Sequence, residues 1–516
     1  MDTKALRRKI LDLAIRGQLV PQDPADEPAS VLLDRIRAET QKMVKEGKLK
    51  AKDIKNDSII FVGEDSLHYE KFADGSVKCI EDEIPFELPE GWAWARLGTV
   101  FSTVTGDTPS TKDASLYGTD YPFYKPTDLD AGYNVCGAED SVSEKGYLSG
   151  RPLPKFSVLV TCIGATIGKT GYISNAGICN QQINAVLPNS EVLSDYTYFC
   201  MCSQYEQEQI WTNSSATTLP ILNKSKFDNL LFPIPPHEQQ SRIVERIKGL
   251  FFFVEKVQSN QESLKTTVGI AKSKILDLAI RGQLVPQDPN DEPASVLLER
   301  IRAEKEELIR QGKLKRDKKE SVIFRGDDNS YYEKVGGEVQ CIDDNVPFEL
   351  PEGWSFMRLK SAWELISGRD LSPSEYNDES NGIPYITGAS NFENGQISVV
   401  RWTPVPQVFT HEGDLLLTCK GTIGEIALNK FGEAHIARQI MAIRNTYNLN
   451  VAFLSLCIEW SMEEIKQAAK GLIPGISRED ILNLILPVPP VEHQKKIVRC
   501  VQTCSEKLNA IFQALS

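Results

Sequence analysis

The chain has 516 residues, a length that usually divides into two or more hydrophobic cores, and its hydrophobic content of 41% is typical of a folded protein. The net charge of −13 disfavours a wholly basic nucleic-acid-binding surface, although net charge averages over all faces of a protein. No apolar stretch has the length of a membrane span, and no signal-peptide core follows the N-terminus, so we expect a cytoplasmic protein.

The eleven cysteines include no Cys-x-x-Cys pair. The closest pairs, Cys200 with Cys202 and Cys500 with Cys504, have no histidine at a metal-ligand spacing. We therefore expect reduced thiols and no metal site in this chain.

The first predicted element is a helical hairpin that occurs twice. Residues 10–39 recur at residues 275–304 with only two differences in thirty positions. In each copy prolines end one helix, and Pro28 or Pro293 begins the next. The charged outer residues agree between the copies, which burial in a core would not require. We interpret this surface as one that docks the same partner twice, with shared ancestry alone as the alternative.

Each hairpin ends in a basic run. Residues 41–56 hold six lysines against two acidic residues, and residues 305–319 hold seven basic against three acidic residues. Solvated helix ends explain either run alone better than DNA contact does. A nuclease-like acid-x-lysine element at Glu46 and Lys48 is disfavoured, because Gln311 replaces the glutamate in the second copy.

Two inserts interrupt the repeated sequence, which we call the frame. The first extends from Trp92 to Pro233 and the second from Trp354 to Pro487, and within them only a skeleton of residues aligns. The frame on either side stays nearly the same. We infer that the frame performs one task twice, whereas the inserts perform two different tasks.

A glycine-rich loop belongs to that skeleton. TCIGATIGKTG (161–171) in the first insert aligns with TCKGTIGEI (418–426) in the second. The first loop resembles a P-loop, but three residues rather than four separate Gly164 from the Gly-Lys pair, and Glu425 replaces Lys169 in the second. A turn that approaches a DNA backbone, or an ordinary tight turn, fits both copies better than a nucleotide site.

No catalytic centre is predicted. The inserts have no Asp/Asn-Pro-Pro-aromatic methyltransferase motif and no glycine-rich cofactor fingerprint after a convincing strand. His237 and His493 lie near predicted helix starts, where capping or surface roles fit better than catalysis.

A long helix with a coiled-coil seam follows the first insert and ends at Gly282, about 65 Å from its start. Its seam consists of Ile243, Ile247, Leu250, Val254, Val257, Leu264, Val268, Ala271, Ile275 and Leu278. After the second insert the seam recurs at Ile497, Val501, Cys504, Leu508, Ile511 and Leu515, and the chain then ends.

The missing half of the second helix lies at the N-terminus, where Leu6, Ile10 and Leu13 match the end of the first seam. We therefore expect one continuous and one split helix, packed antiparallel around a pseudo-two-fold axis, with the chain ends close together. Unrelated amphipathic helices in separate cores are the alternative, but they do not explain the shared register.

The chain resembles the specificity subunits of type I restriction-modification systems over essentially its whole length. The resemblance rests on KILDLAIRGQLVPQ at 9–22 and 274–287, the DEPASVLL segments, LPEGW at 88 and 350, the T-C-x-G loops, and the Pro-Pro pairs before the long helices. It implies a mixed α+β fold, in which two α/β target-recognition domains are separated by an antiparallel coiled coil of long helices. Each domain would read one half of a bipartite DNA site, with half-site centres roughly 34 Å apart.

The resemblance also implies the partners. The chain would dock two DNA adenine methyltransferase subunits and, in the restricting complex, two motor-endonuclease subunits. S-adenosylmethionine, ATP and Mg would serve those partners, and this chain would bind no cofactor. A stand-alone DNA-binding regulator or scaffold is the alternative, and a nucleotide-driven enzyme built on the loop at 164–170 is a second.

The repeat and the resemblance together predict the domain boundaries. The expected segments are a conserved helical segment at 1–50, a connecting hairpin at 51–90, recognition domain 1 at 91–236, a central helical region at 237–315, a second connecting hairpin at 316–352, recognition domain 2 at 353–490, and a C-terminal helix at 491–516 that pairs with the central helix.

Candidate DNA contacts are chosen by side-chain chemistry, because Arg, Lys and Gln donate to bases and hydroxyl groups donate to phosphates. In the first insert they are Thr105, Thr108, Ser110, Lys112, Lys125, Thr127, Lys169, Gln181 and Gln182. In the second they are Ser367, Arg369, Ser372, Tyr385, Thr387, Lys420, Thr422, Arg438 and Gln439.

Overall fold

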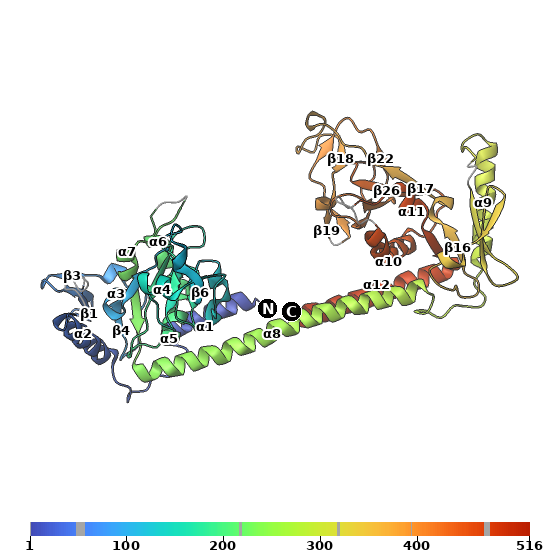
Figure 1. Cartoon of the computed structure of the whole chain (residues 1–516). Coiled ribbons are helices and arrows are strands. Elements are labelled where there is room, and N and C mark those ends of the chain that lie inside the picture. Colours follow the sequence, from blue (N-terminus) through green and yellow to red (C-terminus); the bar gives the residue numbers. More distant parts are fainter. Residues whose placement is uncertain are drawn as a thin grey trace. The chain divides into compact units, whose positions relative to one another are not determined.

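The chain folds into two compact units, residues 1–260 and residues 261–516, and both mix helices with sheets (Figure 1). The predicted mixed fold class is therefore confirmed. The computed structural model describes residues 2–47, 57–215, 219–316, 320–393, 395–468 and 475–515. Lys48, with the rest of 48–56 and residues 317–319 of the two basic runs, lies outside the described residues.

Unit 1 begins with two helices and a small antiparallel sheet and then enters the first insert. The elements before the insert are α1 (Thr3–Ile15), α2 (Ala29–Lys45), β1 (Ser58–Val62), β2 (His68–Phe72) and β3 (Val77–Cys79). Those of the insert are β4 (Ala93–Arg96), α3 (Leu97–Val100), β5 (Thr103–Thr105), β6 (Tyr117–Tyr124), β7 (Asp140–Val142), α4 (Glu144–Ser149), β8 (Val158–Thr161), β9 (Thr170–Tyr172), β10 (Ile178–Cys179), β11 (Ile183–Val186), α5 (Ser194–Met201), α6 (Gln204–Asn213), α7 (Lys224–Asp228) and β12 (Leu231–Ile234). The helix α8 (His237–Ile280) follows and continues into unit 2.

After the end of α8, unit 2 begins as unit 1 does after α1, with one helix and a small antiparallel sheet. Its first elements are α9 (Ala294–Arg310), β13 (Ser321–Arg325), β14 (Tyr331–Val335) and β15 (Glu338–Cys341). The second insert holds β16 (Ser355–Arg358), β17 (Trp363–Ser367), β18 (Ile383–Ile386), β19 (Phe392–Glu393), β20 (Gln396–Ile397), β21 (Trp402–Thr403), β22 (Phe409–Thr410), β23 (Leu415–Thr418), β24 (Ile426–Leu428), β25 (Ala434–Ile436), β26 (Ile440–Asn445), α10 (Val451–Ala468), α11 (Arg478–Leu482) and β27 (Ile485–Val488), and α12 (Val491–Leu515) ends the unit.

The two inserts share a four-stranded antiparallel sheet of the same topology. Its strand order is β5-β11-β8-β9 in unit 1 and β17-β26-β23-β24 in unit 2. The strands of a second sheet lie between those of the first along the chain. The second sheet has the order β10-β6-β7 in unit 1 and β21-β18-β25-β22 in unit 2, and each contains one parallel pair. The inserts that diverge in sequence therefore share a central sheet.

Each insert begins and ends on the same antiparallel strand pair. In unit 1 Ala93 lies opposite Ile234, and Arg96 lies opposite Leu231. The pair β16 with β27 repeats this arrangement in unit 2. The chain thus leaves and re-enters the frame at one place in each unit.

In unit 1, α1 packs antiparallel against α8. Arg7 near the start of α1 pairs with Glu255 at 3.1 Å, whereas Trp92 Nε1 donates to Gln239, near the start of α8, and to Gln22, which follows α1. The apolar side chains between these contacts share one core, with Ile10 and Ile247 both buried.

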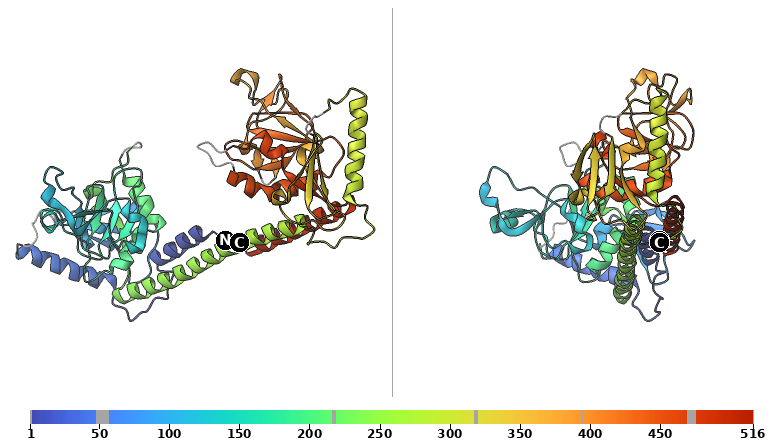
Figure 2. Two further views of the ribbon diagram at one scale, coloured as in Figure 1. Left: turned by 45° about the vertical axis from the view of Figure 1, so that its right-hand side comes forward. Right: turned by 90° about the vertical axis from the view of Figure 1, so that its right-hand side faces the viewer.

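In unit 2, α12 lies beside the remaining part of α8 (Figure 2). Lys272 of α8 donates to Asn509 at 2.7 Å, and His493 contacts the Val285 carbonyl oxygen at 3.0 Å. The α12 sequence therefore runs opposite to α8, as α1 does in unit 1. Each unit contains its own antiparallel helix pair.

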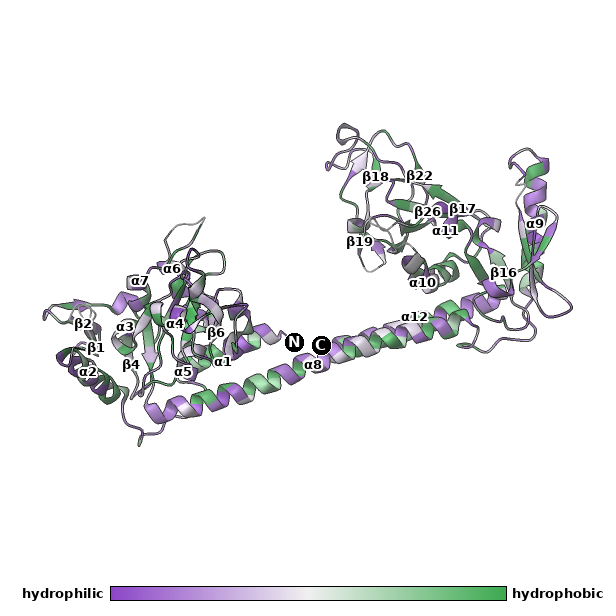
Figure 3. Ribbon diagram, viewed as in Figure 1, coloured by the Kyte–Doolittle hydropathy of each residue, from purple (hydrophilic) through white to green (hydrophobic). Residues whose placement is uncertain are grey.

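The predicted seam is buried or half-buried along α8, where apolar and polar residues alternate (Figure 3). On α12 it holds from Ile497 to Leu508, but Ile511 is 50% exposed, so this seam position was predicted wrongly. The meeting of the two chain ends stays a prediction.

A glycine in the left-handed region ends the first helix of each frame copy. Gly17 follows α1 with φ +64°, and Gly282 follows α8 with φ +72°. A Cβ atom at these positions would lie 2.4 Å from Pro89 and 2.7 Å from Pro351. Both the backbone angle and the proline contact therefore require glycine.

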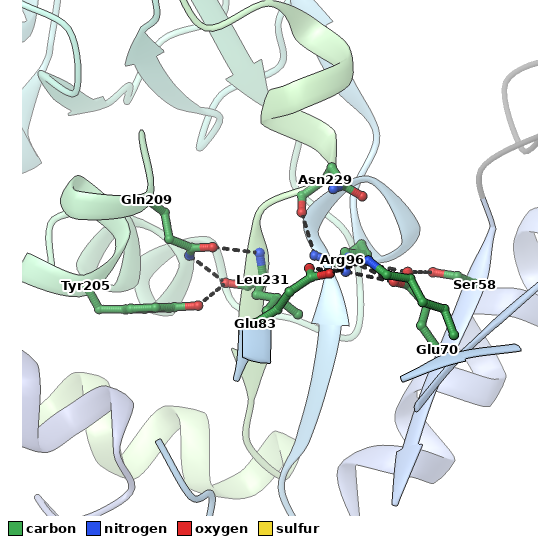
Figure 4. Close-up of polar contacts among 9 residues, drawn as sticks. Ser58, Glu70, Glu83, Arg96, Tyr205, Gln209, Asn229 and Leu231 are labelled. Carbon is green, nitrogen blue, oxygen red and sulfur yellow. Dashed lines mark hydrogen bonds and ion pairs between the residues drawn. The ribbon is translucent and has the colours of Figure 1, made fainter. Parts of the chain in front are cut away.

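The segments predicted as connecting hairpins contain three-stranded antiparallel sheets, β1-β2-β3 and β13-β14-β15. In unit 1 the sheet is attached to the insert by Arg96, whose guanidinium donates to Glu70 and Glu83 (Figure 4). Ser58 donates to the same Glu70 carboxylate at 2.6 Å, and Arg96 also donates to the Asn229 carbonyl oxygen.

Unit 2 repeats the attachment. Arg358 donates to Glu333 at 2.7 Å and to the Asn483 carbonyl oxygen at 2.6 Å, and Ser321 donates to the same glutamate. Because the arginine ends the first strand of each insert, one side chain connects the sheet, the insert and the returning chain.

Among the described residues, no helix combines the length and apolar character needed to cross a membrane.

The buried pair predicts a large effect of substitution at Arg96. The side chains of Arg96 and Glu70 are 7% and 3% exposed, so Arg96→Ala should leave a buried carboxylate unpaired and lower the free energy of unfolding by about 3–5 kcal/mol. Urea unfolding followed by tryptophan fluorescence measures this. Arg300→Ala, which removes an ion pair with side chains 59% and 50% exposed, should cost less than about 1 kcal/mol. Equal losses in the two variants would contradict the role given to Arg96.

Candidate nucleic-acid interface

Three loops meet at one edge of the four-stranded sheet in unit 1. They are residues 105–110, 161–169 and 180–182, which we call the first recognition edge. The loops are joined by main-chain hydrogen bonds from Gly106 to the Ile183 carbonyl oxygen at 2.9 Å and from Cys162 to the Gln182 carbonyl oxygen at 2.7 Å. These bonds fix the relative positions of segments far apart in the sequence.

The same bonds recur in unit 2. Residues 367–372, 418–425 and 437–439 form the second recognition edge. Gly368 donates to the Ile440 carbonyl oxygen at 3.0 Å, and Cys419 donates to the Gln439 carbonyl oxygen at 2.7 Å. The two edges therefore have one backbone plan.

Close backbone contact explains one glycine in each edge. A Cβ atom on Gly106 would lie 2.1 Å from the Asn180 carbonyl oxygen, and one on Gly368 would lie 2.1 Å from the Ala437 carbonyl oxygen. Any larger residue would force the first and third loops apart.

The structure brings most of the predicted residues of the first insert to or beside this edge. Thr105, Thr108, Ser110, Lys169, Gln181 and Gln182 belong to its loops. Lys125 is adjacent to it, because the Asn180 amide donates to the carbonyl oxygen of Tyr124. Lys112 and Thr127 are exposed on neighbouring segments.

The lysines of the first edge are paired with acidic residues. Lys169 Nζ lies 2.7 Å from Asp130, and Lys125 pairs with Asp140. A phosphate would have to compete with these carboxylates. In the second edge Lys420 is exposed and, among the described residues, its ammonium group has no ion-pair partner.

Of the predicted residues in the second insert, Ser367, Arg369, Ser372, Lys420, Thr422, Arg438 and Gln439 are exposed on the second edge. Thr387 is half-buried next to the edge and donates to Asn391. Tyr385 is only 3% exposed, and its hydroxyl oxygen accepts the Leu371 amide at 3.2 Å. In this conformation Tyr385 supports the loop from inside and does not face solvent.

Two arginines at the edges were missed from the sequence. Arg151 Nη1 donates to the Thr105 carbonyl oxygen at 2.6 Å, and Arg478 Nη1 donates to Ser367 Oγ at 3.0 Å. Both are exposed and lie more than forty residues from the loop that they contact. Only their charge is visible in the sequence, and charge alone does not distinguish them from other surface arginines.

A buried histidine holds the second edge in place. His435 is fully buried, with Nε2 2.8 Å from the Arg369 carbonyl oxygen and Nδ1 3.1 Å from the Val408 amide and 3.0 Å from the Val408 carbonyl oxygen. A neutral ring with Nε2–H donates to the Arg369 carbonyl oxygen and accepts the Val408 amide. Burial lowers the pKa of His435 below its usual value. His493, for which a capping or surface role was expected, is also fully buried, and burial lowers its pKa too.

The P-loop-like loop is a closed turn. The amides of Gly164, Ile167, Gly168 and Lys169 all donate to carbonyl oxygens of the chain. These donors are not free to cradle a phosphate. Across the described residues, no group of three or more His, Cys, Asp or Glu side chains has a metal-binding arrangement.

Two unlike sets of exposed polar side chains on one repeated backbone define a recognition protein with two reading surfaces. The family model for the type I restriction modification DNA specificity domain matches residues 89–264 and 351–515. The chain belongs to this family and carries the domain twice. It is a recognition chain rather than an enzyme.

Relatives of the same kind cover nearly the whole chain. The EcoEI specificity subunit of Escherichia coli is 26% identical over 97% of this chain and 88% of its own length. The EcoAI specificity subunit of Escherichia coli is 25% identical over 98% of this chain and 90% of its own length. A solved chain from a study of complex assembly and conformational transition of the type I R-M system shares the fold, with a TM-score of 0.59 and 20% identity over 84% of this chain and 94% of that chain.

The lowered pKa of His435 predicts a pH dependence of unit 2. The neutral ring is favoured in the folded state, so its contribution to stability is present above about pH 6.5 and is lost as the pH falls towards the folded-state pKa. The free energy of unfolding should therefore decrease less between about pH 7 and pH 5 in His435→Gln than in the wild type. Part of the decrease should remain because of His493.

Urea unfolding at both pH values measures this difference. Arg401→Gln, which changes an exposed arginine of the same unit, should retain the wild-type pH dependence. A wild-type pH dependence in His435→Gln would contradict the assignment.

Proposed function

We propose that this chain is the subunit that selects the DNA site of a type I restriction-modification complex in the cytoplasm. Unit 1 reads one half of a bipartite double-stranded site through the first recognition edge, and unit 2 reads the other half through the second. The observation that carries this proposal is the repeated backbone plan of the two edges combined with their different side chains. Two different half-sites require two different sets of base contacts.

We further propose that the length of α8 sets the spacing between the half-sites. The helix has 44 residues, and its sequence belongs to the frame rather than to the inserts. A change in the length of α8 should change the length of the spacer, while the base sequence of each half-site stays the same.

The frame would dock two DNA adenine methyltransferase subunits and, through them, two motor-endonuclease subunits. The helices α2 and α9 support a partner that binds twice, because residues 29–39 and 294–304 differ only at Asp34 and Glu299. Arg35 pairs with Glu27 as Arg300 pairs with Glu292, although Arg35 also pairs with Glu191. S-adenosylmethionine, ATP and Mg would act in those partners.

The proposal predicts the composition of the complex. The full chain, purified from its own host, should bring down two methyltransferase subunits per chain, as native mass spectrometry would measure. Adenine methylation mapped in a cell with both proteins should reveal a bipartite motif with two different halves. A chain that binds a specific motif but retains no methyltransferase would instead indicate a stand-alone regulator.

A further inference from the structure

Each recognition edge holds a pair of interacting side chains at matched positions, and the two pairs differ in chemistry. The first edge holds Thr108 with Gln181, and the second holds Asp370 with Arg438. One member of each pair lies on the first loop of its edge and the other lies on the third loop.

The backbone shows that the two positions are equivalent. The residue before Thr108, Asp107, donates its amide to the Cys179 carbonyl oxygen at 2.8 Å. The residue before Asp370, Arg369, donates its amide to the Ile436 carbonyl oxygen at 2.9 Å. The same hydrogen bond therefore fixes both pairs in their edges.

In the second edge a carboxylate orients an arginine. Asp370 accepts from Arg438 Nε at 2.7 Å and from the Arg438 main-chain amide at 3.1 Å. The Arg438 side chain is 68% exposed, and among the described residues its two terminal nitrogens have no hydrogen-bond partner. These two nitrogens are therefore left to donate to another group.

In the first edge a hydroxyl group orients an amide. Thr108 Oγ1 donates to Gln181 Oε1 at 2.5 Å, and both residues are exposed. The amide oxygen keeps a second lone pair, and no described residue accepts from the amide nitrogen of Gln181. Gln181 thus offers one acceptor and one donor side by side.

These two groups match different bases in the major groove. An arginine pairs with guanine through O6 and N7, whereas a glutamine pairs with adenine through N6 and N7. We propose that Arg438 reads a guanine in the second half-site and that Gln181 reads an adenine at the corresponding place in the first. Asp370 and Thr108 are positioning residues. This inference rests on the proposed function.

The nearby glutamines and lysines do not give the same distinction. The next position is a glutamine in both edges, Gln182 and Gln439, so it does not separate the two half-sites. Gln182 also accepts from Asn180 within its own loop at 2.9 Å. Lysines such as Lys420 supply a charge but no pair of donors in a fixed geometry.

A reciprocal exchange tests the inference. The full chain, with the methyltransferase if it copurifies, would select duplexes from a random-sequence library. Arg438→Gln combined with Asp370→Thr should reduce the preference for guanine at one position of the second half-site by roughly 5- to 150-fold and favour adenine there. Gln181→Arg combined with Thr108→Asp should change one adenine of the first half-site towards guanine.

Single variants separate positioning from folding. Asp370→Ala should weaken the guanine preference at that one position with an unchanged thermal unfolding midpoint. Asp370→Asn keeps an acceptor for Arg438 Nε and should retain more of the preference. Arg401→Gln changes another exposed arginine of the same insert and should leave the motif unchanged.

The possible outcomes are distinguishable. If both double variants select the wild-type motif, the inference is overturned and the proposed function stays intact. An equal loss of affinity for all sequences in folded Arg438 variants would indicate a phosphate contact and would also overturn it. If the wild-type chain selects no motif with or without the methyltransferase, the proposed function fails and the inference fails with it.

Discussion

The strand pair that closes each insert is the constraint on which the rest of the molecule depends. Because β4 pairs with β12 and β16 pairs with β27, each insert leaves and re-enters the frame at one fixed place. Arg96 and Arg358 reinforce this closure, since each donates to the three-stranded sheet and to the carbonyl oxygen just before the returning strand. An insert closed in this way can change its loops without moving the helices around it, and this explains how inserts of different sequence share one frame.

Much of the frame could be predicted from the sequence, because its signals are local and repeated. The seam of α8 and the helix starts after Pro28 and Pro293 follow from apolar spacing and from proline geometry. The three-stranded sheets were expected only as hairpins, because their third strands are short and exposed. Ile511 has the right spacing for the seam but is 50% exposed close to the end of α12, which spacing alone does not show.

The recognition edges were harder to predict, because each is assembled from loops that are distant in sequence. Side-chain chemistry placed Thr108, Gln181 and Arg438 among the candidates. The support that Thr108 gives to Gln181, and the role of Asp370, became visible only when the loops were brought together. Tyr385 was chosen for its hydroxyl group, yet the hydroxyl bonds inside the domain. Arg151 and Arg478 were missed because their contacts cross 46 and 111 residues of sequence. The frame can therefore be predicted from sequence patterns, whereas the recognition edges can be defined only from the tertiary structure.

The central claim is that the inserts determine which bases of the DNA site are recognised and that the frame holds both inserts in the same way. A chain in which residues 93–234 also replace residues 355–488 tests this most directly, because the strand pair at the base of the insert is retained. The DNA motif selected by this chain should have two halves with the same letters, both matching the first half-site of the wild type. A motif that keeps two different halves would contradict the account.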